Sequence, residues 1–452
     1  MMGATGCSFH YGGLLIVLAI LAVNTGPAWS QYCSERPGGC CPGRDDTCTA
    51  PMADTLCYCD DFCLRSKDSD CCPDVFNNCT ALPSTKSPLS PNPLTGDCVY
   101  NGRNYLAGDS FKVNCNTCTC LPTVNGYELQ CEDRVCLIRE EIISTVNPES
   151  YGWRASNYTV LWGMTLEEGI QRRLGTLKPG PALAAMQEIE IEKTNQLPES
   201  FDSRQKWPGW VEGVMDQGNC GSSWAVSTTA VASDRLAIQS MGHMRAPLST
   251  QNLLSCNTRG QRGCDGGHLD RAWYYMHRFG VVTDQCYPYR SGMDKAAEMN
   301  KYTCMLPRYQ SSPCPSDDVT SQKYQVSPPY RISEKEEDIK EELFKNGPLQ
   351  AILVVKEDFY SYAGGVYRYS RESVDDSAEH RQTGYHSVRI LGWGVDRTDP
   401  SNPLPYWLCA NSWGNQWGED GYFKILRGDN ECEIESFVIG VWANVDTDIM
   451  QG

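Results

Sequence analysis

The cysteines constrain the fold of this chain more than any other feature of its sequence. One of the 25 cysteines lies within the first 30 residues, and the others form three groups with even membership. Ten fall between Cys33 and Cys79, six between Cys98 and Cys136, and eight between Cys220 and Cys432. Even membership in each group is typical of separate disulfide-bonded modules that form in an oxidising compartment. The sequence therefore predicts three regions closed by disulfides.

Residues 1–30 have the pattern of a secretory signal peptide. Leu14 to Val23 is an apolar run, and small residues follow it up to a cleavage position after Ser30. The run has about half of the roughly 20 apolar residues that a membrane-spanning helix needs, and no later stretch qualifies. We therefore expect a secreted, extracellular protein without a membrane span.

Zinc is the alternative explanation for the closely spaced cysteines. Cys57 and Cys59, and Cys115 and Cys118, have short spacings that zinc sites also use. The chain has six histidines, however, and its leader sends it to an oxidising compartment. We therefore expect disulfides, no metal site and no cofactor.

The charge of the chain bears on its possible partners, and its length bears on the number of domains. The chain has 39 Lys and Arg against 56 Asp and Glu, and this acidic balance repels phosphate backbones, so nucleic acid is not expected as a partner. At 452 residues the chain is long enough for more than one domain.

The N-terminal half contains two cysteine-rich regions separated by a linker. Residues 31–80 contain the string Cys57-Tyr-Cys-Asp-Asp-Phe-Cys63 and resemble a somatomedin-B module, although extra cysteines leave the disulfide connectivity open. Residues 81–96 are rich in Pro and Ser and are typical of an extended linker. Residues 97–137, with Cys115-Asn-Thr-Cys-Thr-Cys120, resemble a von Willebrand factor type C module.

The remaining chain consists of two stretches that differ in cysteine content and in apolar pattern. Residues 138–196 lack cysteine and include one helical stripe between Met164 and Leu174. Residues 197–452 read as an ordinary globular domain with helices first and strands afterwards, which predicts an α+β fold with a helical lobe facing a sheet lobe. The expected helices begin just after Ser223 and run from Ser333 to Asn346 with a capping box, and the expected strands are 349–355, 386–390 and 406–411.

Three separated strings in this domain carry the candidate chemistry. Asp216-Gln-Gly-Asn-Cys-Gly-Ser-Ser-Trp-Ala225 is followed far downstream by Gly384-Tyr-His-Ser387 and by Asn411-Ser-Trp-Gly414. Together they resemble the papain family of cysteine proteases, with Ser223 at the position of the nucleophilic cysteine. The resemblance is closest to cathepsin B, covers roughly Leu197 to Trp442, and implies a two-lobed domain with a helical lobe and a β-barrel-like lobe.

The resemblance assigns roles to particular residues. It places Ser223, His386, Asn411 and Gln217 at the positions of the active site, with Gln217 as an oxyanion donor and Asn411 orienting His386. It also implies a shield at Trp413, a groove edge at Gly266 and Gly267, a subsite end at Phe437, and a disulfide between Cys220 and Cys264. Cys256, Cys286, Cys304 and Cys314 then pair among themselves, while Cys409 and Cys432 are either bridged or free.

The order of the modules resembles the tubulointerstitial nephritis antigen family. That resemblance implies an extracellular-matrix setting and partners among matrix or basement-membrane proteins, with peptide segments in the groove as further candidates. Residues 138–196, through Tyr151-Gly-Trp-Arg-Ala155 and Leu174-Gly-Thr176, resemble the inhibitory propeptide of cathepsin B. The stretch between Cys286 and Cys304 has no histidine pair, so we expect no occluding loop.

The serine at position 223 predicts loss of peptidase activity. Papain-like catalysis uses a thiolate paired with an imidazolium, and a serine hydroxyl has no comparable ionised state. We therefore expect an inactive, matrix-binding homologue. Two alternatives stay open: residual serine-type peptidase activity, and a decoy or inhibitor of proteases.

Two sequons predict that the chain is a glycoprotein. Asn78-Cys-Thr80 and Asn157-Tyr-Thr159 are acceptor sequences for N-glycans in a secreted chain, and we expect glycans at Asn78 and Asn157.

Overall fold

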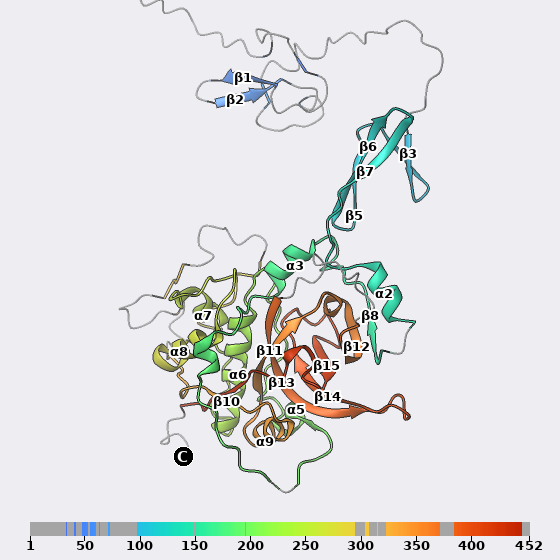
Figure 1. Ribbon diagram of the computed structural model, residues 1–452. Helices are drawn as coiled ribbons and strands as arrows, with labels where there is room; N and C mark the ends of the chain where they lie inside the picture. Colours follow the sequence, from blue (N-terminus) through green and yellow to red (C-terminus); the bar gives the residue numbers. More distant parts are fainter. Residues whose placement is uncertain are drawn as a thin grey trace, which may run out of the picture. The chain divides into compact units, whose positions relative to one another are not determined.

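The computed structural model describes most of the chain from residue 97 to residue 444 (Figure 1). The gaps are 149–150, 195, 294–302, 307–313, 315–321 and 371–383, and in the N-terminal region residues 33, 40–41, 48–52, 55–59, 63 and 71–72 are described. The expected signal peptide, the linker and Asn78 lie outside the described residues. The chain divides into two compact units, Met1–Pro93 and Leu94–Gly452. No described helix is long and apolar enough to cross a membrane.

The first unit is held together by disulfides. Strands β1 (Thr49–Met52) and β2 (Thr55–Tyr58) form an antiparallel pair. Among the few residues of this unit that the structure describes, the buried ones are almost all cysteines, so cross-links do the work of apolar packing there. The disulfides join Cys33 to Cys59, Cys41 to Cys48, Cys57 to Cys72, and Cys63 to Cys71.

The second cysteine-rich region opens the second unit with five short strands. Three disulfides hold it: Cys98–Cys120, Cys115–Cys136 and Cys118–Cys131. An Asn-Gly turn with positive φ at both residues joins the first two strands, as two-residue hairpins require. The strands are β3 (Asp97–Tyr100), β4 (Arg103–Leu106), β5 (Ser110–Val113), β6 (Asn116–Thr123) and β7 (Gly126–Cys131).

Residues 138–196, which we call the propeptide-like segment, have three helices and one strand in their described part: α2 (Glu140–Val146), β8 (Trp153–Ala155), α3 (Leu166–Arg173) and α4 (Pro181–Ala184). Helix α3 is shorter than the apolar stripe predicts, because Thr165 and Glu168 form a capping box that fixes its start.

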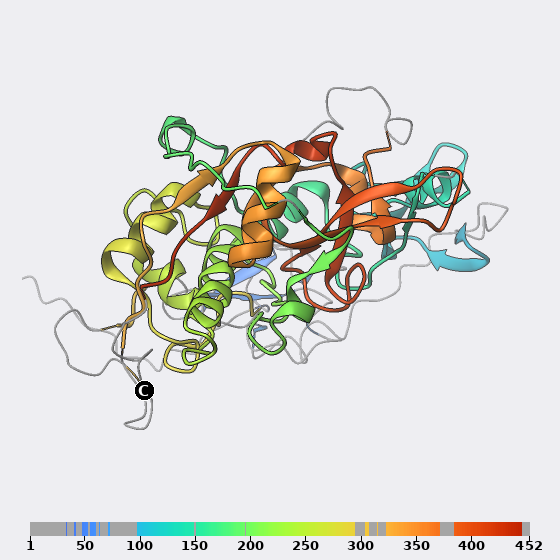
Figure 2. The same ribbon diagram turned by 90° about the horizontal axis from the view of Figure 1, so that it is seen from below.

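The helical lobe is built around α6 (Ser223–Gln239), which is buried over nearly its whole length. Helices α7 (Thr250–Cys256) and α8 (Leu269–Phe279) pack beside it. Disulfides Cys220–Cys264, Cys256–Cys304 and Cys286–Cys314 close the loops of this lobe. Figure 2 shows these green and yellow helices on one side and the orange and red strands on the other.

The sheet lobe is a nine-stranded sheet with the order β10-β16-β11-β13-β14-β15-β12-β8, and β9 also pairs with β13. Its central strand β13 is buried in the middle of its run and paired on both sides. The strands are β9 (Phe201–Asp202), β10 (Tyr330–Ile332), β11 (Leu349–Val355), β12 (Tyr362–Tyr367), β13 (Gly384–Asp396), β14 (Leu404–Ala410), β15 (Tyr422–Leu426) and β16 (Val438–Gly440). Short helices α5 (Ser203–Lys206), η3 (Glu357–Ser361) and η5 (Glu431–Glu433) connect them.

One expected helix start is wrong. Helix α9 spans Glu336–Asn346, and its N-cap is Lys335 without a side-chain cap. Ser333 forms no capping box, because its hydroxyl donates to the carboxylate of Asp338 at 2.5 Å. In a capping box the Ser333 oxygen would accept from the backbone N–H of Glu336, but here it accepts from the backbone N–H of Lys335 at 3.2 Å.

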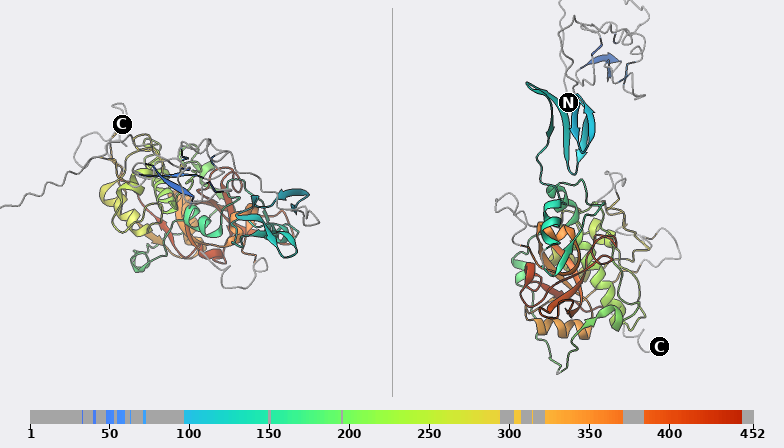
Figure 3. Two further views of the ribbon diagram at one scale, coloured as in Figure 1. Left: turned by 90° about the horizontal axis from the view of Figure 1, so that it is seen from above. Right: turned by 90° about the vertical axis from the view of Figure 1, so that its right-hand side faces the viewer.

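The propeptide-like segment is part of the sheet lobe. Strand β8 extends the sheet as the antiparallel neighbour of β12. Apolar side chains of the segment, among them Ile138, Ile142 and Trp153, belong to the same buried cluster as the strands. In Figure 3 the blue-green part of the chain that follows the turquoise strands lies against the orange strands, and Figure 1 labels β8 there beside β12. The segment is therefore integral to the fold of the second unit.

Cys409 and Cys432 are free thiols in the structure, and both are buried in the sheet lobe. Burial raises the pKa of each thiol, so both stay protonated near neutral pH.

Candidate active site and the segment that occupies it

The four residues at the active-site positions come from both lobes. Ser223 is the first residue of α6, and Gln217 lies in the loop before that helix. His386 lies on β13, and Asn411 directly follows β14. All four side chains are buried.

His386 is oriented by Asn411. Its Nε2 lies 2.7 Å from Asn411 Oδ1, and the Trp413 ring lies 5.2 Å away, centroid to centroid. Its Nδ1 has no hydrogen-bond partner among the described residues. Burial lowers the pKa of His386 to about 4, against the opposing effect of the Asn411 hydrogen bond. The imidazole is therefore neutral at physiological pH, without the charge that a catalytic ion pair requires.

The hydroxyl of Ser223 is directed toward the propeptide-like segment. Its Oγ lies 2.9 Å from Thr176 Oγ1, and the Ser223 side chain has no solvent exposure. Thr176 in turn donates to Ser387 Oγ at 2.8 Å. Within the described residues, no hydrogen bond joins Ser223 to His386, so the pair that would transfer a proton is not formed.

The expected oxyanion donors bind a carbonyl of the chain itself. Gln217 Nε2 donates to the carbonyl oxygen of Leu174 at 3.0 Å, and the Ser223 backbone N–H donates to the same oxygen at 3.3 Å. Ser412 fixes the orientation of the Gln217 amide by donating to its Oε1 at 2.6 Å. The Leu174 carbonyl therefore occupies the place that a substrate oxyanion would take.

The groove edge is also occupied by the segment. Gly267 N–H donates to Gly175 O, and Leu177 N–H donates to Gly267 O, both at 2.9 Å. Thr176 forms a second bridge, antiparallel to Tyr385. This part of the segment therefore lies as a strand between the two lobes and takes the backbone pairing that a bound peptide would use.

Close approach of two backbones explains a glycine at position 175. Gly175 has φ of +118°, and a Cβ there would lie 2.0 Å from the carbonyl oxygen of Gly221. Gly266 lies on the other side, where its own Cβ would come 3.0 Å from the Gly175 carbonyl. Only glycine at this position lets the backbone of the segment lie so close to the backbone at Gly221.

The segment continues past Phe437. Leu183 lies in the buried cluster against which Phe437 packs. The guanidinium of Arg331 lies 5.4 Å from the Phe437 ring and donates to the carbonyl of Ala184 at 3.0 Å. The subsite end that the resemblance placed at Phe437 is thus covered by residues of the same chain.

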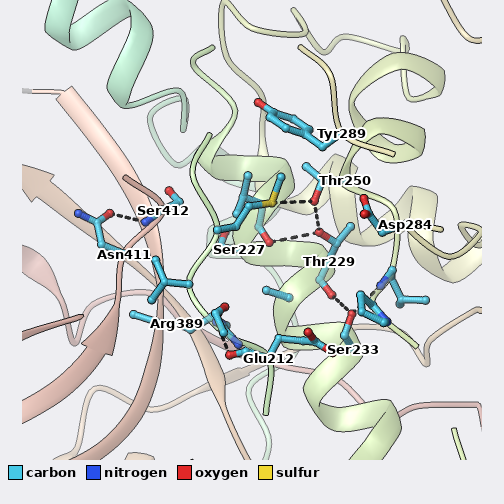
Figure 4. A pocket seen from close by; sticks show the side chains of 18 of the residues that line it. Glu212, Ser227, Thr229, Ser233, Thr250, Asp284, Tyr289, Arg389, Asn411 and Ser412 are labelled. Atoms are coloured by element: carbon cyan, nitrogen blue, oxygen red, sulfur yellow. Dashed lines mark hydrogen bonds between the residues drawn. The ribbon is translucent and has the colours of Figure 1, made fainter. Parts of the chain in front are cut away.

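A cavity of about 460 Å³, lined by both polar and apolar residues, lies between the lobes (Figure 4). Ser412 and Asn411 border it on the sheet side, and Thr229 borders it on α6. Glu212 and Asp284 also line it, and burial raises the pKa of both carboxyls. Ser387, Asn411 and Ser412 of this lining stand in the strings that resemble the papain family, but no motif marks the rest, which comes from short stretches far apart in the chain.

The described residues offer one group with metal-binding spacing, formed by Cys33, Cys59 and Cys72. All three are in disulfides, so none has a thiolate to offer. Asn157 is exposed, as a glycan acceptor must be.

Comparison with known proteins places this arrangement in a family. The model of the papain family of cysteine proteases matches residues 197–442. A solved structure of procathepsin B S9 from Trypanosoma congolense aligns with a TM-score of 0.58 and 31% identity, covering 68% of this chain and 99% of that chain.

Two curated relatives match along nearly the whole length. Human tubulointerstitial nephritis antigen-like is 43% identical over 434 residues, which cover 94% of this chain and 90% of that protein. Bovine tubulointerstitial nephritis antigen is 44% identical over 431 residues, covering 92% and 87%. The chain therefore belongs to the tubulointerstitial nephritis antigen family and carries a papain-family domain.

Proposed function

We propose that this chain is a secreted glycoprotein that has no peptidase activity and binds extracellular-matrix or basement-membrane proteins. The observation that carries the proposal is the position of the Leu174 carbonyl, which takes both oxyanion donors while Ser223 stands where a thiolate is needed.

Three features support the absence of catalysis. Serine has no ionised state comparable to a thiolate, so it needs a base to remove its proton during attack. The base at hand, His386, makes no hydrogen bond to Ser223 within the described part of the chain. The burial of both side chains leaves no room for a substrate carbonyl. Residual serine-type activity would require the segment to leave the groove first.

Secretion is supported by the cysteine chemistry and the leader. Ten disulfides are formed among the described residues of the chain, and such bonds persist in oxidising compartments. The signal-peptide pattern of residues 1–30 and the two sequons fit the same route.

The closed groove favours recognition by the disulfide-rich modules. Because the segment takes the backbone pairing of Gly267, an external peptide would have to displace it. A decoy that inserts the segment into another protease is disfavoured for the same reason. Cross-linked modules present rigid surfaces at low entropic cost, as matrix adhesion needs.

The test compares two secreted proteins, the full chain and a variant lacking residues 31–93, which lie within a separate compact unit. Both are applied to immobilised basement-membrane extract, and both are assayed with fluorogenic peptide substrates from mildly acid to neutral pH. We expect no turnover by either protein and weaker matrix binding by the variant. Substrate turnover by the full chain that is abolished by Ser223→Ala would refute the first claim. Equal binding would move adhesion to the second unit.

A further inference from the structure

Four buried hydroxyls link the propeptide-like segment to both lobes. They belong to Thr176 of the segment, Ser223 and Ser227 of α6, and Ser387 of β13, and each residue is at most 5% exposed. We call them the hydroxyl ring.

Proton counting fixes the direction of every bond in the ring. Ser227 donates to the Ser223 carbonyl at 2.8 Å, so its contact with Ser387 Oγ, also 2.8 Å, must be donated by Ser387. Thr176 donates its one proton to Ser387 at 2.8 Å. The contact of 2.9 Å between Ser223 and Thr176 must therefore be donated by Ser223. The four bonds therefore form a circuit that starts at the Ser223 hydroxyl, passes through Thr176, Ser387 and Ser227, and ends at the Ser223 carbonyl.

A cysteine could not begin this ring. A thiol is a weak donor, and the thiolate that papain-like catalysis needs has no proton to donate. The oxygen of Ser223, by contrast, places its proton on Thr176 within ordinary hydrogen-bond distance. The serine at this position is thus chemically matched to the segment.

We propose that Ser223 is a positioning residue that holds the propeptide-like segment in the groove. A serine in place of the catalytic cysteine then adds a structural hydrogen bond and also removes the nucleophile. The inference rests on the proposed loss of peptidase function, because a position required for catalysis could not also donate its proton to the segment. Bonds within such a ring polarise one another, which makes each member sensitive to the loss of any other.

The test measures amide hydrogen exchange of the secreted full chain at two N–H groups that join segment and groove, those of Leu177 and Gly267. In Ser223→Ala we expect exchange about tenfold faster at these amides, because a buried acceptor on Thr176 loses its donor. Thr176→Val breaks the ring at the same bond and is expected to have the same effect, with little added effect in the double variant. Thr176→Ser keeps the hydroxyl and is expected to exchange as slowly as the native chain.

The matched control is Ser233→Ala. Ser233 also lies buried on α6, but its hydroxyl bonds to Thr229 and Leu248 within the helical lobe. Its loss is expected to lower overall stability without accelerating exchange at Leu177 and Gly267. If Ser223→Ala and Thr176→Val exchange no faster at these amides than Ser233→Ala, the inference is wrong. This result would be separate from failure of the proposed function, because exchange rates report neither turnover nor matrix binding.

Discussion

Asp234 and Arg389 form an ion pair of 2.7 Å that joins α6 of the helical lobe to β13 of the sheet lobe. Both side chains are buried, and Arg389 also donates to the carbonyls of Glu212 and Gly213. The pair therefore lies inside the molecule, where the two lobes meet beneath the active-site positions.

Breaking this pair is expected to destabilise the second unit strongly. Asp234→Asn leaves the Arg389 charge buried without its counter-ion, so we expect a loss of about 3 kcal/mol in the free energy of unfolding. Urea denaturation measures this loss. The control is Glu199→Gln, because the pair of Glu199 with Arg397 is largely exposed and is expected to contribute less than about 1 kcal/mol. Similar losses in the two variants would contradict the buried role of Asp234.

The buried imidazole predicts a dependence of stability on pH. The pKa of His386 is lowered from 6.5 to about 4 by burial, so the unfolded chain takes up the proton first as the pH falls. The His386 contribution to stability is present above pH 6.5 and is lost as the pH falls toward 4. We expect the native chain to lose about 3 kcal/mol relative to His386→Gln over this range.

The comparison with His386→Gln isolates the contribution of the His386 side chain to the pH dependence of stability. Burial raises the pKa of Asp234 to about 6, which gives a contribution of opposite sign that falls as the pH rises. That contribution is common to both proteins and cancels in their difference. A constant difference between the two unfolding free energies from pH 6.5 to pH 4 would show that His386 is not buried as the structure places it.

A cysteine at position 223 is expected to be protected by the segment. Ser223→Cys should react slowly with thiol-directed epoxides, because the side chain has no exposure and Thr176 lies against it. Gly175→Ala forces a Cβ to within 2.0 Å of a backbone oxygen and should displace the segment. We expect the double variant to be labelled at least about tenfold faster at mildly acid pH, as local opening would produce. Equal labelling rates, measured by mass spectrometry, would mean that the segment does not cover this position.

The two free thiols are expected to be unreactive toward alkylating reagents in the folded chain. Cys409 and Cys432 are buried, and burial raises the pKa of both, so neither offers a thiolate to an alkylating reagent. Iodoacetamide should modify both after unfolding without a reductant, and neither before. Peptide mapping that finds them joined by a disulfide would contradict this state.

Glycans are expected at Asn78 and Asn157. Treatment of the secreted chain with an N-glycosidase should increase its electrophoretic mobility, and Asn157→Gln should remove part of that shift because Asn157 is exposed. Unchanged mobility after treatment would rule out both sites.

The four residues that the resemblance assigns to the active site could be named from the sequence because short strings carry them. Gln217 and Ser223 stand in one string of ten residues, and His386 and Asn411 lie in two other short strings further along the chain. The helix that begins at Ser223 and the buried strand Leu349–Val355 also followed from local pattern. The inactivity of these positions stays a prediction that the assays above must test.

The occupation of the site could not be read in the same way. The carbonyl of Leu174 is a backbone atom, which any residue type provides, and it meets Gln217 across 43 positions of chain. The hydrogen bond between Thr176 and Ser387 joins residues 211 positions apart, so no local sequence pattern predicts it. The misplaced cap at Ser333 has a related cause, because Glu334, Glu336, Glu337 and Asp338 all follow this serine closely and the sequence alone does not determine which of them it contacts.

The pairing of β8 with β12 has a mechanical consequence. Helix α2 and strand β8 follow the disulfide-rich modules along the chain, so tension applied to the modules would act first on the buried side chains of Ile138 and Ile142 and then on β8. The load on β8 would fall on the backbone bonds that Val366 N–H donates to Gly152 O and that Ser156 N–H donates to Ser361 O, together with the buried ring of Trp153. A molecule fixed to a matrix at its N-terminal end would thus transmit pulling force into the edge of its sheet, and loss of the β8 pairing would lengthen the tether between the modules and the papain-family domain.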